Sequence, residues 1–219
     1  MKAAGVIFDL DGVLCSTDEY HYQAWKRIAD SIHAAFDRTV NNRLRGVSRM
    51  ESLEIILEKY NGPVLGIEQK ECLADEKNRL YRGRLEEMSP SDVPEKVRCT
   101  LAALKEKGLK LAVGSSSKNT PLILEQSGLK CYFDAVCDGN QITKSKPDPE
   151  VFLKAAEMLG LEPAECLVVE DALSGAQAGH KGGFTVVCVG DAAVMGAGDF
   201  NISEFNELLR ITESSVCNG

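Results

Sequence analysis

The sequence predicts an α/β protein: a doubly wound, parallel-sheet core of the Rossmann-like type, with a small all-helical cap inserted after the first strand. Three observations lead to this expectation. Residues 4–8 form a short apolar run that ends in two aspartates and a glycine. Amphipathic helical segments then occupy about residues 18–88 without an intervening strand. From residue 93 onward, predicted strands and helices alternate, as in parallel sheets covered by helices.

The opening run is typical of a buried strand, because it is short, apolar and bounded by glycine. The helical block that follows, residues 17–88, is expected to form the cap, and residues 1–16 and 89–219 the core. Ser48 and Glu51 form a capping box that begins the second of three amphipathic stretches. The apolar residues at helical spacing are Tyr22, Trp25, Ala29 and Ile32, then Leu53, Ile56, Leu57 and Tyr60, then Leu73, Leu80, Tyr81, Leu85 and Met88.

In the alternating region, glycines mark the ends of predicted helices. The pattern predicts one helix over 94–107 and a second that ends at Gly128. A third begins at Asp148-Pro149 and ends at Gly160, and a fourth covers 203–210. Strands are predicted over 109–113, 135–137, 166–169 and 185–189. Ligands of such sheets bind beyond the carboxyl ends of the strands. This rule gathers distant polar residues in one crevice: Asp9, Asp11, Ser115, Glu170 and Asp171.

Composition excludes several classes of function. The 219 residues carry a net charge of -8, so non-specific nucleic-acid binding, which needs a basic surface, is not expected. We find no signal segment at the start and no apolar run near the roughly 20 residues of a membrane span, so we expect a cytoplasmic protein with no membrane partner. The eight cysteines show no metal-knuckle or redox spacing and are interpreted as reduced thiols.

Paired aspartates after the first strand are the most informative chemical feature. Two charges about 4 Å apart repel by roughly 4 kcal/mol at an effective dielectric constant near 20. Such a pair persists when a cation lies between the carboxylates or when one of them holds a proton; a solvated turn is the simplest alternative. Oxygen-only ligands favour Mg²⁺. Lys146 and Ser115 add a cation and a hydroxyl, so the group suits phosphoryl transfer.

The segments Asp9-Leu-Asp-Gly-Val13, Ser115, Lys146-Pro147 and Glu170-Asp171 resemble, in order and spacing, the four signature segments of the haloacid dehalogenase superfamily. The resemblance covers residues 4 to about 190. It implies that Asp9 is a nucleophile that becomes an aspartyl phosphate, and that Asp11 is a general acid and base. It also implies a Mg²⁺ site formed by Asp9, the Asp11 carbonyl, Glu170 and Asp171.

The helical insert resembles more narrowly the cap of the β-phosphoglucomutase family. The matching segments are Glu19–Trp25, Leu44–Leu53, Glu76–Asn78, Ser89–Val93 and Ser115–Asn119. This resemblance implies interconversion of β-glucose 1-phosphate and 6-phosphate through a bound 1,6-bisphosphate. Ser115 and Lys146 would then hold the transferring phosphate, and Thr17 and His21 would position Asp11. Substrate binding would fall to Arg45, Gly46, Arg49, Lys77, Ser117, Lys118 and Asn119.

Alternatives remain open at this level. The position of Arg45 is usually lysine in the family, which places its sugar contact in doubt. Lys77 has an equally simple interpretation as a solvated helix face, and Arg49 as a surface arginine. A sugar-phosphate phosphatase uses the same Asp9 chemistry with water as acceptor, and a catalytically silent phosphometabolite-binding protein is a third possibility. We expect a monomer whose partners are a small sugar phosphate and bisphosphate; the preferred hexose is not predicted.

Overall fold

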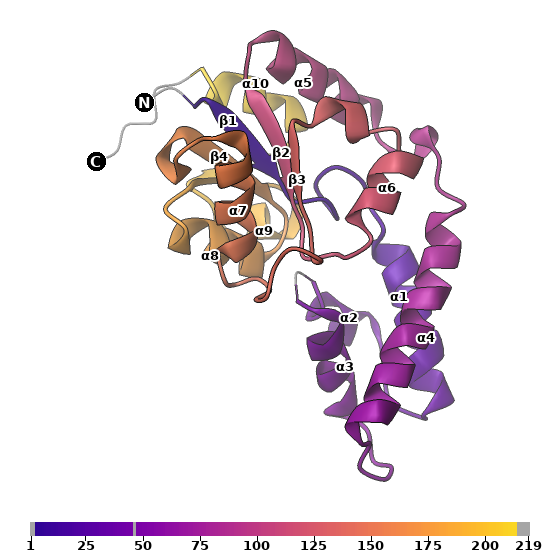
Figure 1. The fold of residues 1–219 in the computed structure, drawn as a ribbon. Helices are drawn as coiled ribbons and strands as arrows, with labels where there is room; N and C mark the ends of the chain where they lie inside the picture. Colours follow the sequence, from indigo (N-terminus) through magenta and orange to yellow (C-terminus); the bar gives the residue numbers. More distant parts are fainter. Residues whose placement is uncertain (1–2, 46, 214–219) are drawn as a thin grey trace.

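The computed structural model describes residues 3–45 and 47–213, and it confirms the predicted fold class (Figure 1). A six-stranded sheet has the order β3-β2-β1-β4-β5-β6, and all neighbouring strands are parallel. The first strand therefore lies in the interior of the sheet, as its apolar run predicted. The strands are β1 (Gly5–Phe8), β2 (Lys110–Gly114), β3 (Ala135–Cys137), β4 (Cys166–Glu170), β5 (Thr185–Cys188) and β6 (Phe200–Asn201).

Helices cover both faces of the sheet because side chains alternate along each strand. In β1, Val6 and Phe8 belong to one apolar cluster, whereas Ile7 belongs to another. The first cluster includes residues of α5 (Glu95–Glu106), α6 (Thr120–Gln126) and α10 (Leu208–Ile211). The second includes residues of α7 (Glu150–Leu159) and α8 (Leu173–Lys181). The remaining core elements are α9 (Gly190–Val194) and the 3₁₀ turns η1 (Pro90–Asp92), η2 (Lys130–Tyr132), η3 (Pro163–Glu165) and η4 (Phe205–Glu207).

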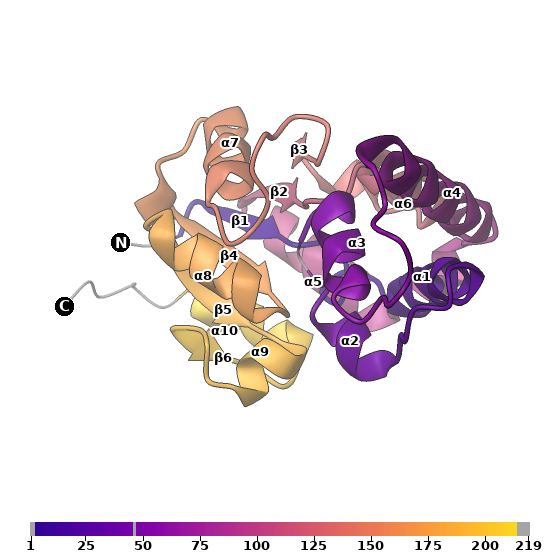
Figure 2. The same cartoon turned by 90° about the horizontal axis from the view of Figure 1, so that it is seen from below.

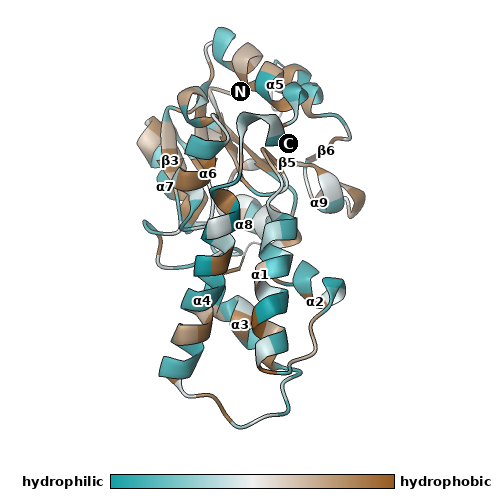
Figure 3. Ribbon diagram, turned by 90° about the vertical axis from the view of Figure 1, so that its right-hand side faces the viewer, coloured by the Kyte–Doolittle hydropathy of each residue, from teal (hydrophilic) through white to brown (hydrophobic). Residues whose placement is uncertain are grey.

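The first four helices after β1 form the cap, which lies beside the core in Figure 2. Its helices are α1 (Asp18–Ser31), α2 (Arg38–Asn42), α3 (Arg49–Leu57) and α4 (Ile67–Leu85). Figure 3 shows α1 and α4 running side by side from the core to the far tip of the cap. Trp25, Phe36, Leu53 and Ile56 are buried in an apolar cluster of the cap itself. Tyr81 at the core end of α4 joins the cluster of the sheet instead.

Several local predictions can be compared with the structure. The capping box of α3 is confirmed: the Ser48 N–H donates to the Glu51 carboxylate at 2.8 Å, and Glu51 N–H donates to Ser48 Oγ at 3.3 Å. Gly160 ends α7 with a φ of 66°, a conformation that favours glycine. The helix predicted over 203–210 is instead a 3₁₀ turn followed by α10, and the sequence did not predict α2 or β6.

The first residue of α7 differs slightly from the prediction. The helix begins at Glu150, and Pro149 occupies the capping position. The Asp148 carboxylate still accepts a hydrogen bond from the Glu150 N–H at 3.1 Å. Within the described residues all seven cysteines are free, and Cys217 lies outside them. No helix in that part of the chain is both long and apolar enough to cross a bilayer.

Candidate active site

The register of the sheet places the predicted site residues together. Phe8 pairs with Val113 of β2 and with Val169 of β4, so three strands end at the same level. The next residue along β1, Asp9, donates its N–H to the Val169 carbonyl at 2.9 Å. Ser115 follows β2, and Glu170 is the last residue of β4. These residues line one cavity of about 580 Å³ between the strand ends and the cap helices α1, α3 and α4.

Three carboxylates form the floor of this cavity, and one buried lysine, Lys146, lies in contact with two of them. Asp9, Glu170 and Asp171 are buried, and they present oxygens that lie within 4.8 Å of one another. Lys146 Nζ donates to Asp9 Oδ1 and to Glu170 Oε1, each at 2.5 Å. Burial alone would lower the pKa of Lys146, but the two carboxylates raise it above its ordinary value. The lysine is therefore a permanent cation that offsets part of the negative charge.

The remaining negative charge is still uncompensated, and the residues present fit a hard divalent cation. Burial, followed by the charges of Glu170 and Asp9, raises the pKa of Asp171 to about 8. Burial also raises the pKa of Glu170 to about 6, although Lys146 opposes this change. Oxygen-only donor sets of this kind suit Mg²⁺. A divalent ion bound at this cluster would favour the ionised forms of Glu170 and Asp171.

Two glycines leave space for these carboxylates. A Cβ atom at Gly12 would lie 2.0 Å from Asp171 Oδ2, and one at Gly175 would lie 1.9 Å from Glu170 Oε1. Either would force the acidic side chain to move. Gly12 also has a φ of 80°, which disfavours other residues there. The glycine that follows the paired aspartates is thus required by both the turn and the cluster.

Asp11 lies outside the three-carboxylate cluster and faces residues of the hinge and cap. Thr17 Oγ1 donates to Asp11 Oδ1, and the Tyr81 hydroxyl lies 2.9 Å from the same Thr17 oxygen. His21 Nε2 is 4.0 Å from Asp11 Oδ2. The Asp11 side chain is 25% exposed, but the cavity walls enclose it, and this burial raises its pKa to about 7. The charge of Asp9 also raises this pKa, whereas the hydrogen bond from Thr17 lowers it.

Lys77 is buried, so its interpretation as a solvated helix face is wrong. Its Nζ lies 2.8 Å from His21 Nδ1 and 4.4 Å from the centre of the Tyr81 ring. Burial lowers the pKa of Lys77 to about 7, and the nearby Arg49 adds to this change. Burial, followed by the charge of Lys77, also lowers the pKa of His21 well below its ordinary value. The two side chains form a polar wall of the cavity beside Asp11.

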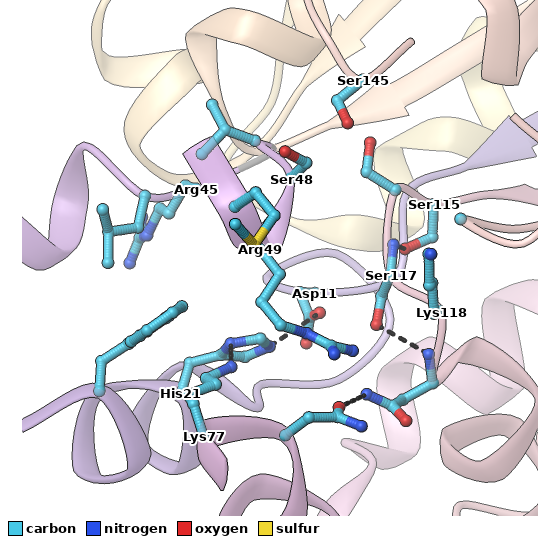
Figure 4. A pocket seen from close by; sticks show the side chains of 18 of the residues that line it. Asp11, His21, Arg45, Ser48, Arg49, Lys77, Ser115, Ser117, Lys118 and Ser145 are labelled. Atoms are coloured by element: carbon cyan, nitrogen blue, oxygen red, sulfur yellow. Dashed lines mark hydrogen bonds and ion pairs between the residues drawn. The ribbon is translucent and has the colours of Figure 1, made fainter. Parts of the chain in front are cut away.

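Arg49 and the loop after β2 face each other across the cavity (Figure 4). Arg49 is the first residue of α3, its side chain is 26% exposed, and Nη1 lies 3.6 Å from Asp75 Oδ1. Ser115 Oγ accepts from the Ser117 N–H, and Ser117 Oγ accepts from the Asn119 N–H, each at 3.2 Å. Figure 4 shows the Arg49 guanidinium directed toward the side of the cavity that carries Ser117 and Lys118. These groups form a second cationic region, apart from Lys146.

Arg45 has partners that the sequence did not reveal. Its guanidinium binds Asp18 of α1 and Asp191 of α9, and Nη1 lies 3.8 Å from Asp171 Oδ2. Gly46, predicted beside it as a substrate contact, lies outside the described residues. The sequence offered a signal for Asp191, because it comes soon after β5 at the same edge of the sheet where Asp171 follows β4. The sequence signal for Tyr81 was weaker, because its helical spacing indicated only an apolar contact.

Asn119 also has partners on the cap. Its Nδ2 donates to Asn78 Oδ1 at 2.9 Å, and its Oδ1 accepts from Arg82 Nη1 at 3.3 Å. Both partners belong to α4, one and two helical turns from its core end. The loop after β2 is therefore attached to the cap by side chains. The sequence pattern predicts Asn119 as a site residue, but it does not indicate that Asn78 and Arg82 contact it.

Comparison with known proteins agrees with this arrangement. The family model of haloacid dehalogenase-like hydrolases matches residues 3–183. The chain is 40% identical to a β-phosphoglucomutase of Bacillus subtilis over 214 residues, which are 95% of this chain and 92% of that protein. It is 33% identical to a phosphorylated carbohydrates phosphatase of Thermotoga maritima, over 81% of each chain.

Among solved structures, a β-phosphoglucomutase of Clostridium difficile superposes with a TM-score of 0.89. That protein is 33% identical, and the match covers 96% of both chains. Sequence and fold therefore agree over nearly the whole molecule, including the segments that carry Asp9, Lys146 and Asp171. The chain belongs to the haloacid dehalogenase-like hydrolase family.

Proposed function

We propose that the chain is a Mg²⁺-dependent β-phosphoglucomutase that interconverts β-D-glucose 1-phosphate and β-D-glucose 6-phosphate. The observation that supports this most is a cavity with two separate cationic regions. Lys146 binds Asp9 and Glu170 at the carboxylate floor, and Arg49 and Lys118 line the cavity from α3 and from the loop after β2. A sugar bisphosphate needs two such regions, whereas a simple phosphate ester needs one. The 40% identity to a β-phosphoglucomutase supports the same choice.

In the proposed mechanism, an Asp9 oxygen attacks one phosphorus of the bound sugar 1,6-bisphosphate. The bond from phosphorus to the sugar oxygen breaks, and Asp11 gives its proton to that oxygen. Ser115 and Lys146 hold the oxygens of the transferring phosphoryl group. A Mg²⁺ ion held by Asp9, the Asp11 carbonyl, Glu170 and Asp171 would neutralise negative charge on the carboxylates and the phosphate. Transfer of the phosphoryl group from Asp9 to the free hydroxyl of a bound sugar monophosphate runs these steps in reverse and restores the bisphosphate.

Asp11 must serve as an acid in one direction and as a base in the other. A pKa of about 7 suits both tasks near neutral pH, because comparable fractions are protonated and ionised. Thr17 and His21 would hold its carboxylate in position through the contacts described above. Lys77 would reach the sugar from the cap, and Arg49, Ser117, Lys118 and Asn119 would hold the second phosphate.

The phosphatase alternative keeps the same nucleophile and uses water as acceptor. It is favoured by the 33% identity to a carbohydrate phosphatase. The deciding experiment incubates the purified protein with Mg²⁺, β-glucose 1-phosphate and a catalytic amount of the 1,6-bisphosphate. We expect glucose 6-phosphate to form much faster than free phosphate. Rapid phosphate release without isomerised sugar would instead support the phosphatase, and binding without turnover would support a silent binding protein.

Arg49→Ala tests the second phosphate site. Loss of a charge-assisted contact to phosphate costs about 1.5–3 kcal/mol, so kcat/KM for the mutase reaction should fall roughly 10- to 100-fold. Hydrolysis of a small aryl phosphate should change little, because that substrate has only the phosphate bound near Lys146. The matched control is Arg43→Ala, which removes another cap arginine that pairs with Glu58 on the surface. Equal losses with both substrates would contradict the role of Arg49.

A further inference from the structure

Arg45 connects the cap to the core through carboxylates on both sides. Asp18 is the first residue of the cap helix α1, and Asp191 lies in the core helix α9. Arg45 Nη1 donates to Asp191 Oδ2 at 2.8 Å, and Nη2 donates to Asp18 Oδ2. The Arg45 carbonyl also lies 3.4 Å from Ser174 Oγ at the start of α8. We call the Asp18–Arg45–Asp191 arrangement the Arg45 bridge.

The environment of Arg45 differs from that of an ordinary surface arginine, whereas its partner Asp191 is 64% exposed. The Arg45 side chain is 27% exposed, and burial alone would lower its pKa, but Asp18, Asp171 and Asp191 raise it. Its Nε atom is buried and has no hydrogen-bond partner among the described residues. A partly desolvated guanidinium loses more when a carboxylate partner is removed than an exposed one does. The ion pair with Asp191 therefore favours the conformation in which the cap lies on the core.

A second set of polar contacts joins the cap to the core elsewhere. It consists of the hydrogen bonds from Asn78 and Arg82 of α4 to Asn119. The Arg45 bridge instead uses the segment just before α3 and lies beside the acidic cluster, at Asp171. The two connections hold different walls of the same cavity. Losing the Arg45 bridge should thus open the cavity on the side of the carboxylates, where the phosphoenzyme would form.

We propose that Asp191 is a positioning residue, which holds Arg45 across the boundary and sets how fully the cap closes over the phosphorylated Asp9. This inference rests on the proposed function. A closed cap excludes water from the reactive carboxyl phosphate while the sugar acceptor is retained. The strength of the Arg45 bridge would then determine how the phosphoryl group divides between sugar and water. Asp191 itself is not among the residues that line the cavity.

The test compares Asp191→Asn with Glu58→Gln. Both variants remove one negative charge from a carboxylate paired with arginine, but the Glu58 pair lies wholly within the cap. For Asp191→Asn we expect the ratio of released phosphate to glucose 6-phosphate to rise at least about threefold, the scale of a weak ion pair. Backbone hydrogen exchange at 44–48 and 190–194 should also accelerate without any substrate. Glu58→Gln should change neither quantity, and Asp191→Glu should restore both.

The outcomes separate this inference from the proposed function. Faster exchange in Asp191→Asn, in a protein that only hydrolyses phosphate esters, would support the bridge and contradict the mutase. Unchanged exchange with full mutase activity would overturn the bridge and leave the mutase standing. Thermal unfolding identifies global destabilisation, since a lowered Tm with exchange accelerated throughout the core would also overturn the inference.

Discussion

Replacing Asp9 by asparagine should abolish both sugar isomerisation and phosphate release. The amide has nearly the same shape as the carboxylate, but it is not a competent nucleophile toward phosphorus. Removal of a covalent nucleophile is among the most costly changes an enzyme can suffer, so kcat should fall by at least about 10⁴-fold. Parallel assays of glucose 6-phosphate and free phosphate measure the two activities on one sample.

The variant should remain folded, which makes its inactivity interpretable. Asp9 raises the pKa values of Glu170 and Asp171, so its neutralisation relieves repulsion in the cluster. Lys146 keeps Glu170 as a partner at 2.5 Å. The unfolding midpoint in the absence of metal is therefore expected to be unchanged or higher. Undiminished hydrolysis of an aryl phosphate by Asp9→Asn would end the assignment of the nucleophile, and loss of isomerisation alone would indicate direct attack by water.

The part of the site that follows from strand order was predictable from the sequence. Asp9, Ser115 and Glu170 each lie at the carboxyl end of a strand, and parallel pairing aligns those ends. The spacing of apolar runs and glycines was sufficient to locate these ends within a residue or two. By contrast, β6 has only two residues and carries no period that a pattern can reveal.

The part of the site that depends on cap position was not predictable. Arg45 and Asp191 are 146 residues apart, and only the placement of the cap on the core brings them together. Lys77 shows the same limit in another form. Its helix is polar overall, so its sequence does not distinguish a face toward solvent from a face toward a closed polar cavity. The sequence shows the sign of each charge and therefore the kind of partner that would stabilise it. Only three-dimensional packing determines which residue becomes that partner.

Lys146→Met is expected to produce the largest loss of stability, and the loss should depend on pH. The lysine is buried between Asp9 and Glu170, and removing one partner of such a group costs about 3–5 kcal/mol. Lys146 itself stays charged from pH 5 to pH 8, so its own titration adds no slope there. Without it, the already raised pKa of Glu170 rises further, because Lys146 opposes that rise.

A carboxyl group with a raised pKa in the folded state contributes stability at low pH that is lost as pH rises through that pKa. The deficit of Lys146→Met should therefore be largest at pH 8 and smaller at pH 5, where Glu170 and Asp171 bind protons. Millimolar Mg²⁺ should reduce the deficit at pH 8, because a cation in the cluster replaces part of the missing charge.

Urea unfolding in the presence of EDTA or of Mg²⁺ measures the free energy of unfolding of each variant. Lys96→Met, which removes an exposed partner of Glu204, should cost less than about 1 kcal/mol and serves as the control. Equal deficits at both pH values would show that Lys146 contributes by packing rather than by charge, and its assignment as the cation of the phosphate site would then lose its electrostatic basis.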